Sequence, residues 1–475
     1  LHAGRGFASY PHILPLGGLR DALGPGQVER KEDPETHERR DVYEGYNAKN
    51  AYARGTPCHH DTLRKLAKDT DPERLEAWFG TEVPRLYREM GAYDEEGIFV
   101  LDGSYLFVPD NERYEESSRL RFDEHNHPMS KKDYEALTPK QQEKTHWERC
   151  YRKVSLLHAS RDGDRFLYAG VSVMAGKDAE TPEMGVLVDR FVGAVGRGVM
   201  KVLLVDRGFI DGPTIGRIKQ EHGVDVVVPL KKNMDNYKDA WRLADVDKGP
   251  WRVWRPPVPE PPPHPPQRPE ALRRAEEKRQ RTVAEKKAAL SGLTPPPVAV
   301  DRVELKVIPR MRLWEACPVP VDVVLLREFL TDGTVNQWAL ATTAEVKDPL
   351  EVWDLYKLRA SSIEERHRQT KLFWDVTRFS SCAFSLVVNQ VVYTLLAYSL
   401  LQVYLLKTGR EELAPATRER LLDKLTSADR AVAVYYKHRV AYYPQDDFTL
   451  MTLVLREGAR RRAIGTVEKQ IARRL

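Results

Sequence analysis

Two aspartates directly follow runs of apolar residues, and a much later stretch combines adjacent glutamates with a tyrosine, an arginine and a lysine. Asp102 lies in FVLDGSYL, Asp206 lies in LLVDRGFI, and the stretch from Leu355 to Lys371 reads LYKLRASSIEERHRQTK. Mg²⁺ prefers carboxylate oxygens and commonly shares them with substrate phosphates. Two such ions a few ångströms apart can activate an attacking hydroxyl and stabilise the leaving oxygen in an in-line phosphoryl transfer. We therefore expect both aspartates and one glutamate to form a metal-dependent phosphoryl-transfer site.

The elements around these residues follow the order of a mixed α/β sheet. Helices are expected after Asp61, after Asp71-Pro72, from Thr181 to about Gly198, and from Asp211 to about Glu221. Strands are expected at 97–108, 201–206 and 224–230, with a hairpin of 154–160 and 165–175 around the turn RDGD. Open sheets place ligand sites near strand ends, which favours a functional role for both aspartates. The alternative for each is an ordinary edge or turn residue.

Composition sets broad limits on the class of protein. The 475 residues, 41% of them hydrophobic, are enough for a core in two or three domains. The net charge of +5 is too small to indicate a nucleic-acid partner by itself, although the basic residues are clustered. Four widely separated cysteines without a CxxC pair argue against a zinc ribbon or a disulfide scaffold and are typical of a reducing cytosol.

Two segments bear on targeting. The opening LHAGRGFASYPHILP is unlike a signal peptide, and we expect the chain to be a trimmed piece of a longer protein. The segment from Phe384 to Leu406 is long enough to span a bilayer. Because it contains Asn389, Gln390 and Gln402, we interpret it as a buried core helix and expect no membrane association.

With Asp102 and Asp206, the later Y-x-x-R…E-x6-K pattern resembles the DDE transposases of bacterial insertion sequences, specifically the IS-four type with a YREK signature. The resemblance covers about residues 95–400, including a β-containing insertion between the second aspartate and the glutamate. It implies a ribonuclease-H-like mixed sheet with flanking helices, together with two Mg²⁺ ions for which Mn²⁺ substitutes. It further implies endonuclease and strand-transfer activity on double-stranded DNA by a cut-and-paste route, with hairpinned ends as one variant. A homodimer in the synaptic complex and a cytoplasmic, nucleoid-associated location in a bacterium are also implied.

Carried over residue by residue, the resemblance assigns two sets of residues. Those for catalysis and metal binding are Asp102, Asp206 and Glu364, and those for DNA phosphate are Tyr356, Arg359 and Lys371. Glu364 and Lys371 stand seven positions apart, so they face the same side of a helix. The family places three residues between the arginine and the glutamate, whereas four stand between Arg359 and Glu364. In a regular helix the extra residue would turn Arg359 away by about 100°.

Two backbone arrangements would accommodate the extra residue. A π-bulge could absorb it, as is common at functional sites. Alternatively, the regular helix could begin later, with Ser362 as N-cap and Glu365 completing a capping box. In that second arrangement Glu365 is structural and Glu364 remains for the metal. Glu365 as the catalytic residue is the open alternative.

Three further residues are candidates for DNA contact. Trp338, in VNQWALATTA, stands about where the family has a tryptophan that stacks on a flipped base, and every base offers an aromatic face for such stacking. The alternative is a core tryptophan within a strand. Lys231 and Lys232 follow a strand and could contact the DNA backbone, although a surface strand end explains them equally.

We expect five domains or parts of domains along the chain. A mostly helical region at 1–92 could contact DNA ends, and the catalytic core comprises 93–250 and 346–410. An insertion at 251–345 combines a polyproline segment, a charged helix at 268–287 and a small β part with strands at 300–308, 321–329 and 335–344. A basic helical region at 411–475 ends the chain. The competing functions are a structure-selective DNA nuclease with the same carboxylates and a decayed DNA-binding protein derived from a transposase.

Overall fold

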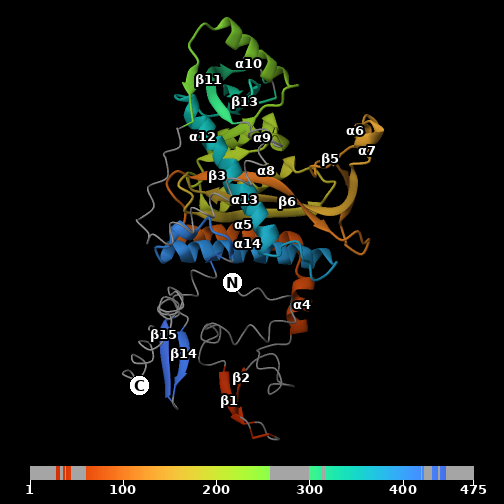
Figure 1. The fold of residues 1–475 in the computed structure, drawn as a ribbon, viewed down its shortest axis with the longest axis vertical. Helices are drawn as coiled ribbons and strands as arrows, with labels where there is room; N and C mark the ends of the chain where they lie inside the picture. The colour runs from red at the N-terminus through yellow and green to blue at the C-terminus, as the bar shows by residue number, and fades with distance from the viewer. Residues whose placement is uncertain are drawn as a thin grey trace, which may run out of the picture. The chain divides into compact units, whose positions relative to one another are not determined.

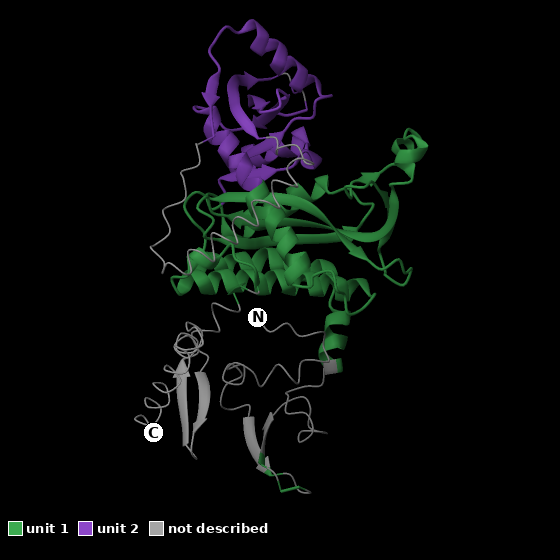
Figure 2. Cartoon of the chain, in the orientation of Figure 1, with its two compact units in different colours: residues 1–199, 360–475 green, residues 200–359 purple. Residues whose placement is uncertain are grey.

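The chain divides into two compact units, which Figure 2 colours separately. Unit 1 comprises Leu1–Val199 and Ala360–Leu475, and unit 2 comprises Met200–Arg359. The structure is a computed structural model, and the residues that it describes are 28–32, 36–37, 39–43, 60–256, 299–312, 314, 316–418, 420–421, 431–436 and 439–444. The expected polyproline segment from residue 257 onward, the charged helix at 268–287 and the basic tail after residue 455 lie outside the described residues.

Unit 1 is built around the long strand β6 (His146–Ala159). β6 pairs antiparallel with β3 (Ile98–Val108) along one edge, and with β7 (Phe166–Ala175) and then β4 (Ser118–Phe122) along the other. β5 (Pro128–Met129) extends this sheet beyond β4. The predicted strand and hairpin are confirmed. The sequence analysis does not predict β4 or the start of β6, where charged residues are frequent, and it does not predict β5, which has only two residues.

Helices cover β7 in unit 1. α5 (Pro72–Glu89), α8 (Thr181–Val195) and α14 (Phe384–Lys407) all pack against it (Figure 1), and α4 (His60–Asp69) packs against α14. The predicted helices are confirmed. The Asp71 side chain accepts a hydrogen bond from the Arg74 amide at 3.1 Å and so opens α5, whereas Asp61 lies inside the first turn of α4. Two short helices after β5, α6 (Lys131–Glu135) and α7 (Pro139–Gln142), each begin with a capping box.

α14 forms polar contacts that belong to a protein interior. The Asn389 side chain donates to the Ala67 carbonyl at 3.0 Å, and the Ser399 hydroxyl accepts from the Tyr168 amide at 2.9 Å. Among the described residues, α14 is the one helix whose length and composition would suffice to cross a bilayer. Its buried polar residues have protein partners, which supports the interpretation as a core helix.

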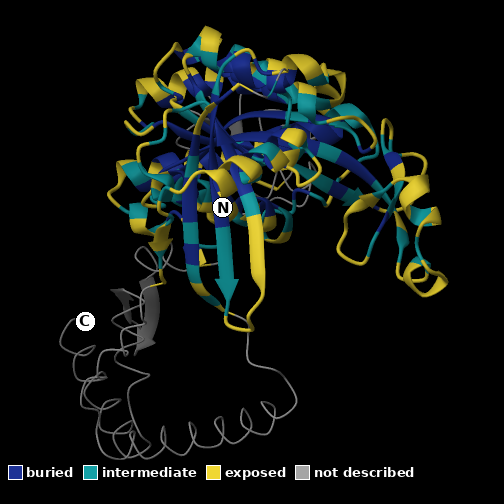
Figure 3. Cartoon of the chain, turned by 90° about the horizontal axis from the view of Figure 1, so that it is seen from above, coloured by how far each residue is buried: buried dark blue, intermediate teal, exposed yellow. Residues whose placement is uncertain are grey.

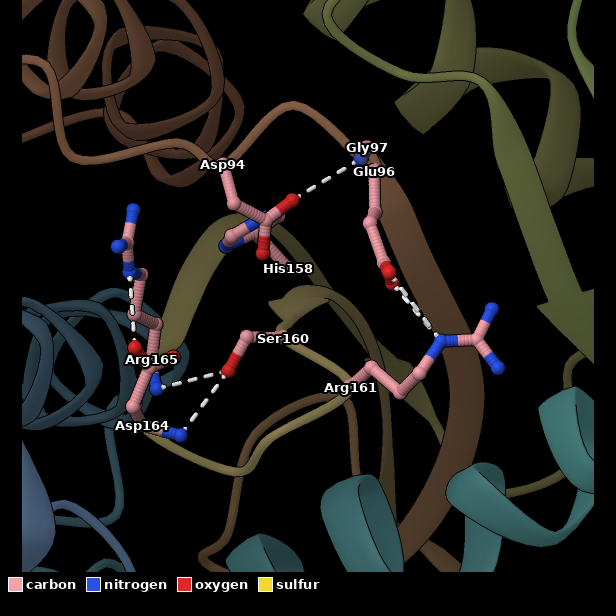
Figure 4. A network of polar contacts seen from close by, with 8 residues as sticks. All are labelled: Asp94, Glu96, Gly97, His158, Ser160, Arg161, Asp164 and Arg165. Atoms are coloured by element: carbon pink, nitrogen blue, oxygen red, sulfur yellow. Dashed lines mark hydrogen bonds and ion pairs between the residues drawn. The ribbon is translucent and has the colours of Figure 1, made fainter.

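A polar network fixes the entry to β3 against the turn between β6 and β7 (Figure 4). The Asp94 carboxylate accepts the Gly97 amide at 3.0 Å and lies 3.4 Å from Nε2 of the fully buried His158. On the surface nearby, Arg161 donates to Glu96 at 3.1 Å. Burial would by itself raise the pKa of Asp94, but His158 and the Gly97 amide outweigh burial and lower that pKa. The network therefore helps to set the position of the strand that carries Asp102.

Unit 2 contains a second set of strands in the order β10-β11-β12-β13-β9-β8. β8 and β9 are parallel, and the other neighbours pair antiparallel. The bounds are β8 Val202–Val205, β9 Asp225–Pro229, β10 Arg252–Trp254, β11 Val300–Met311, β12 Val321–Leu330 and β13 Val335–Thr342. The strands predicted at 201–206, 224–230, 300–308, 321–329 and 335–344 are confirmed as β8, β9, β11, β12 and β13, whereas the sequence analysis does not predict β10.

The helical elements of unit 2 flank these strands. Their bounds are η4 Arg207–Phe209, α9 Gly212–Arg217, η5 Ile218–His222, α10 Asp235–Val246 and α12 Pro349–Arg359. The helix expected after Asp211 is confirmed, and it finishes in the π-helical turn η5. α10 is not predicted by the sequence, because Met234 at its N-cap offers no side-chain cap.

The expected mixed α/β fold is confirmed, with most strand residues of both units buried and the outer helix faces exposed (Figure 3). Two antiparallel hairpins occur that the sequence patterns do not predict. One pairs β1 (Val28–Glu32) with β2 (Arg39–Tyr43), and the other pairs β14 (Ala431–Tyr436) with β15 (Arg439–Pro444). β1 and β2 consist mostly of charged residues and β14 is apolar throughout, so none of the three shows alternation of apolar and polar side chains.

Candidate active site and DNA-contact surface

The helical stretch that carries the two glutamates contains a π-helical turn. α12 ends at Arg359, the five-residue π-helix η6 covers Ala360–Glu364, and α13 runs from Glu365 to Phe373. A π-helical turn holds one residue more than a regular turn, so it absorbs the fourth residue between Arg359 and Glu364. The first of the two expected arrangements is therefore confirmed. The capping box of Ser362 and Glu365 is wrong, because Ser362 is buried inside η6 and α13 opens without a side-chain cap.

The adjacent glutamates have different surroundings. Glu365 pairs with Arg368 at 2.5 Å and accepts the side-chain amide of Gln369 at 3.0 Å. The hydrogen bond from Arg368 lowers the pKa of Glu365. Glu364 is exposed and lines a pocket in unit 1. Because Glu364 lines the pocket and Glu365 does not, these placements favour Glu364 over Glu365 as a metal-binding candidate.

This cavity, which we name the carboxylate pocket, has a volume of about 460 Å³. Strand β3 and the η6–α13 segment supply its lining residues, which are Asp102, Gly103, Ser104, Glu364, His367, Arg368, Lys371 and Leu372. The helical members are spaced by three and four positions, which places them on one helix face. The structure therefore brings together three of the residues expected from the sequence: Asp102, Glu364 and Lys371.

The opposite face of α13 is anchored in the interior of unit 1. The Arg366 side chain is 2% exposed, and its guanidinium lies 4.2 Å from the Phe166 ring centre. It donates to the Tyr398 hydroxyl at 3.3 Å and to the Ala414 carbonyl at 3.4 Å. Because this face is fixed by buried contacts, the Glu364 face has a defined direction toward β3.

Asp102 lies among cationic side chains in a largely desolvated region. Burial lowers the pKa of Lys153 to about 7, with the charge of Lys371 adding to the effect and Asp102 opposing it. Burial also lowers the pKa of Lys371 to about 8, again opposed by Asp102. His367 Nε2 is 3.8 Å from Asp102 Oδ2. Low dielectric strengthens electrostatic interactions, so each of these charges influences the others more than it would in water.

Asp206 and Arg359 lie together in unit 2. Asp206 directly follows β8 and occupies the N-cap of η4. Arg359 Nη2 is 3.5 Å from Asp206 Oδ1, and the guanidinium lies 6.0 Å from the centre of the Tyr356 ring. Burial raises the pKa of Tyr356. A planar guanidinium held in this way can form paired hydrogen bonds to a phosphate.

A second cavity of about 630 Å³ in unit 2, which we name the aromatic pocket, contains the other sequence candidates. Its lining residues are Arg207, Pro229, Leu230, Lys231, Lys232, Asn233, Trp338 and Tyr356. The rings of Trp338 and Tyr356 lie 6.0 Å apart at 58°, and Trp338 is partly exposed. This exposure is more typical of a ring that contacts a ligand than of a core tryptophan. Lys231 and Lys232 are both exposed at the rim.

The donor atoms in the carboxylate pocket fit a hard divalent ion. Among the residues that the structure describes, no group of three or more His, Cys, Asp or Glu side chains is arranged to hold a metal ion. Asp102 and Glu364 nevertheless share the carboxylate pocket. Magnesium is commonly bound by one or two carboxylates together with substrate phosphate oxygens and water. The two carboxylates would therefore suit Mg²⁺ or Mn²⁺, with water in the DNA-free protein and substrate phosphate oxygens in the DNA complex as the remaining ligands.

Several residues at these sites are not predicted by the sequence analysis. His367 and Arg368 line the carboxylate pocket, and Arg207 lines the aromatic pocket. The helical spacing from Glu364 would have indicated His367, which is three positions later. Lys153 has a weaker signal, because it is a charged residue at a buried position of β6 and is followed mostly by apolar residues.

Comparison with known proteins agrees with this arrangement. The family model described as "Transposase DDE domain" matches residues 96–400, which include every candidate site residue named above. The search of curated proteins gives no match.

Proposed function

The chain belongs to the transposase DDE-domain family, and from this premise we propose that it performs cut-and-paste transposition of an IS-four type insertion sequence. Family membership implies a DNA substrate and a transposase or endonuclease activity. The observation that carries the finer proposal is the carboxylate pocket, where Asp102 and Glu364 lie beside Lys371. The same proposal includes a homodimer that holds two element ends, in the bacterial cytoplasm at the nucleoid.

The catalytic carboxylates in this proposal are Asp102, Asp206 and Glu364. When bound, two Mg²⁺ or Mn²⁺ ions would supply Lewis-acid stabilisation to the attacking and leaving oxygens of the phosphoryl transfer. The carboxylates hold the negative charge that retains such ions, and their mutual repulsion is offset in the bound state. The YREK signature residues Tyr356, Arg359 and Lys371 hold the scissile phosphate, for which cationic and hydroxyl donors are suited.

The reaction has two in-line steps. Water attacks the phosphorus at the element end, and the P–O3′ bond breaks to release a 3′-hydroxyl. That hydroxyl then attacks a phosphorus of the opposite strand or of the target DNA, and the P–O3′ bond of the attacked strand breaks, so that its 3′-oxygen leaves as a hydroxyl. Attack on the opposite strand gives a hairpin, and attack on the target gives the joined product. Trp338 stacks on a base extruded near the cut, and Lys231 and Lys232 contact the backbone beside it.

Nicking and strand transfer on DNA that carries the element's own ends test this proposal. We would compare the parent protein with Glu364→Gln and with the adjacent control Glu365→Gln, in Mn²⁺. Because metal stabilisation of the transition state amounts to several kcal/mol, Glu364→Gln should lower both rates by about 10³-fold or more. Glu365→Gln removes a largely solvent-accessible ion pair with Arg368 and should change the rates only slightly.

Other results would identify the competing functions. Nicking that ignores the element ends and never produces strand transfer would indicate a structure-selective nuclease. DNA binding without metal-dependent cleavage in the parent protein would indicate a decayed binding protein. Full activity in both glutamine variants would exclude the η6–α13 segment from the active site.

A further inference from the structure

A buried lysine lies next to the carboxylate pocket on the same face of the sheet as Asp102. In the β3–β6 register, Asp102 is opposite Ser155 and Ser104 is opposite Lys153. Residues two apart on a strand share a face, so Asp102 and Lys153 are diagonal neighbours. Lys153 is 0% exposed. Burial of an ammonium group is costly unless it has polar partners, so its presence calls for a specific interaction.

The partner of Lys153 is the histidine between it and Asp102. Lys153 Nζ lies 3.3 Å from His367 Nδ1, and His367 Nε2 lies 3.8 Å from Asp102 Oδ2. In its protonated form Lys153 has donors and no acceptor, so His367 Nδ1 then accepts the hydrogen bond. The hydrogen of the neutral ring is then on Nε2, the nitrogen that faces the Asp102 carboxylate. The protonated lysine thus selects the tautomer whose N–H faces Asp102 across 3.8 Å, an electrostatic contact that is longer than a hydrogen bond.

We propose that His367 and Lys153 are positioning residues for Asp102, with Lys153 acting through the imidazole of His367. Metal-binding carboxylates are commonly oriented by hydrogen bonds from neighbouring side chains, and loss of such a neighbour weakens metal binding. Both residues are nearly or fully buried, at 6% and 0% exposure, so they keep a fixed geometry without water as a competitor. This inference rests on the proposed metal-dependent function of the same pocket.

A simple charge effect of Lys153 makes the opposite prediction. A cation close to a metal site repels the metal ion, so removal of that cation alone would tighten metal binding. Removal of a positioning residue weakens metal binding instead. The sign of the change therefore separates the two roles, and a double-mutant cycle isolates the part that passes through His367.

Mn²⁺ affinity of the DNA-free protein, measured by electron paramagnetic resonance, is the main test, with the nicking kcat as a second readout. His367→Leu should weaken Mn²⁺ binding and lower kcat by about 10- to 100-fold. His367→Gln is the matched variant, because its amide N–H lies near the position of Nε2 and can still donate to Asp102. It should recover most of the loss. Equal Mn²⁺ affinity in the leucine and glutamine variants would overturn the proposal.

Lys153→Met completes the cycle. In the parent background it should weaken Mn²⁺ binding, and in the His367→Leu background it should have no further effect. Tighter Mn²⁺ binding in both backgrounds would assign Lys153 a charge effect and overturn its positioning role. Thermal unfolding checks that the variants fold, and should Lys153→Met fail to fold, the two His367 variants still decide the role of the histidine.

The measurement also separates this inference from the proposed function. A parent protein that binds Mn²⁺ but does not cut DNA would refute the transposase activity. The effects of His367→Leu and His367→Gln on Mn²⁺ affinity would then still test the positioning role. Full Mn²⁺ affinity in His367→Leu, in a protein that cuts DNA, would refute positioning and leave the transposase activity in place. Absence of Mn²⁺ binding by the parent would overturn the positioning role as well.

Discussion

The carboxylate pocket of unit 1 and the aromatic pocket of unit 2 are built from different kinds of side chain. The first is lined by two carboxylates together with histidine, arginine and lysine. The second is lined by a tryptophan, a tyrosine and three cationic residues, with no carboxylate among its lining residues. Carboxylates suit metal binding, whereas aromatic faces and exposed cations suit bases and phosphates. The contrast is consistent with the proposal that metal ions bind in the carboxylate pocket and that bases and backbone phosphates bind in the aromatic pocket.

Burial of the charges differs between the two pockets as well. Asp102 is 9% exposed and its cationic neighbours have lowered pKa values, whereas Lys231 and Lys232 are exposed. Buried charges interact strongly and are little affected by salt, whereas exposed charges are screened. Variants of the carboxylate pocket should therefore change metal affinity and kcat. Variants of the aromatic pocket should change DNA affinity and its salt dependence.

The largest expected effect in the aromatic pocket comes from Trp338→Ala. Stacking of a base on an aromatic ring contributes about 1–3 kcal/mol, so binding and cleavage of element ends should fall by about 5- to 150-fold. Fluorescence of 2-aminopurine placed near the cut would report whether a base is unstacked. Trp338→Phe keeps an aromatic face and should retain most of the signal.

The same variant can contradict the division between pockets. Trp338 lies outside the carboxylate pocket, so Mn²⁺ affinity of the DNA-free protein should equal that of the parent. A large fall in Mn²⁺ affinity, with base unstacking unchanged, would mean that the two pockets do not divide metal and DNA contact as proposed.

A smaller effect, on stability alone, is expected from Asp94→Asn in the scaffold of unit 1. The substitution removes the charge that accepts the Gly97 amide and attracts His158, and this should lower the free energy of unfolding by about 1–3 kcal/mol at neutral pH. Mn²⁺ affinity should stay close to that of the parent, because the carboxylate supports the entry to β3 and does not line the pocket. Glu96→Gln is the matched control, since its ion pair with Arg161 is exposed.

The pH dependence of this effect has a defined sign. The folded-state pKa of Asp94 is lowered, so its carboxylate contributes stability above the unfolded pKa of about 3.9, and this contribution is lost as the pH falls through the lower folded value. Urea unfolding as a function of pH should show the parent and Asp94→Asn converging in acid. A stability difference that persists unchanged at the lowest pH would contradict the ionic role of Asp94.

Local sequence signals predict most of the main helices and strands. Asp71 followed by Pro72 indicates the start of α5, and the apolar run before Asp206 indicates β8, because capping and burial act within a few residues. The sequence does not predict α10, since that helix depends on packing against β11 and β12 and not on end signals of its own. Tertiary contacts decide such elements, and a local pattern contains no information about them.

The sequence predicts only part of the candidate site, because the rest also depends on tertiary contacts. Helical spacing places Glu364 and Lys371 on one face, and the structure places both in the carboxylate pocket. The choice between a π-helical turn and a capped helix start depends on the burial of Ser362, which the sequence leaves open. Lys153 is 214 residues from His367 along the chain, so their contact follows from strand register and helix docking together. The catalytic and DNA-binding roles themselves stay predictions.

The smallest expected effects are those of Lys231→Ala and Lys232→Ala at the rim of the aromatic pocket. Each lysine that neutralises a phosphate releases counterions, so each substitution should reduce the slope of log K against log[salt] by about 1. Lys238→Ala is the control, because this exposed lysine of unit 2 is paired with Asp235 at 3.0 Å and does not line the pocket. Filter-binding titrations from low to high salt would measure the slopes. If the slopes of Lys231→Ala and Lys232→Ala match that of the control, these lysines do not contact the DNA backbone. The residues of the aromatic pocket that remain as candidates for DNA contact would then be Trp338, Tyr356 and Arg207.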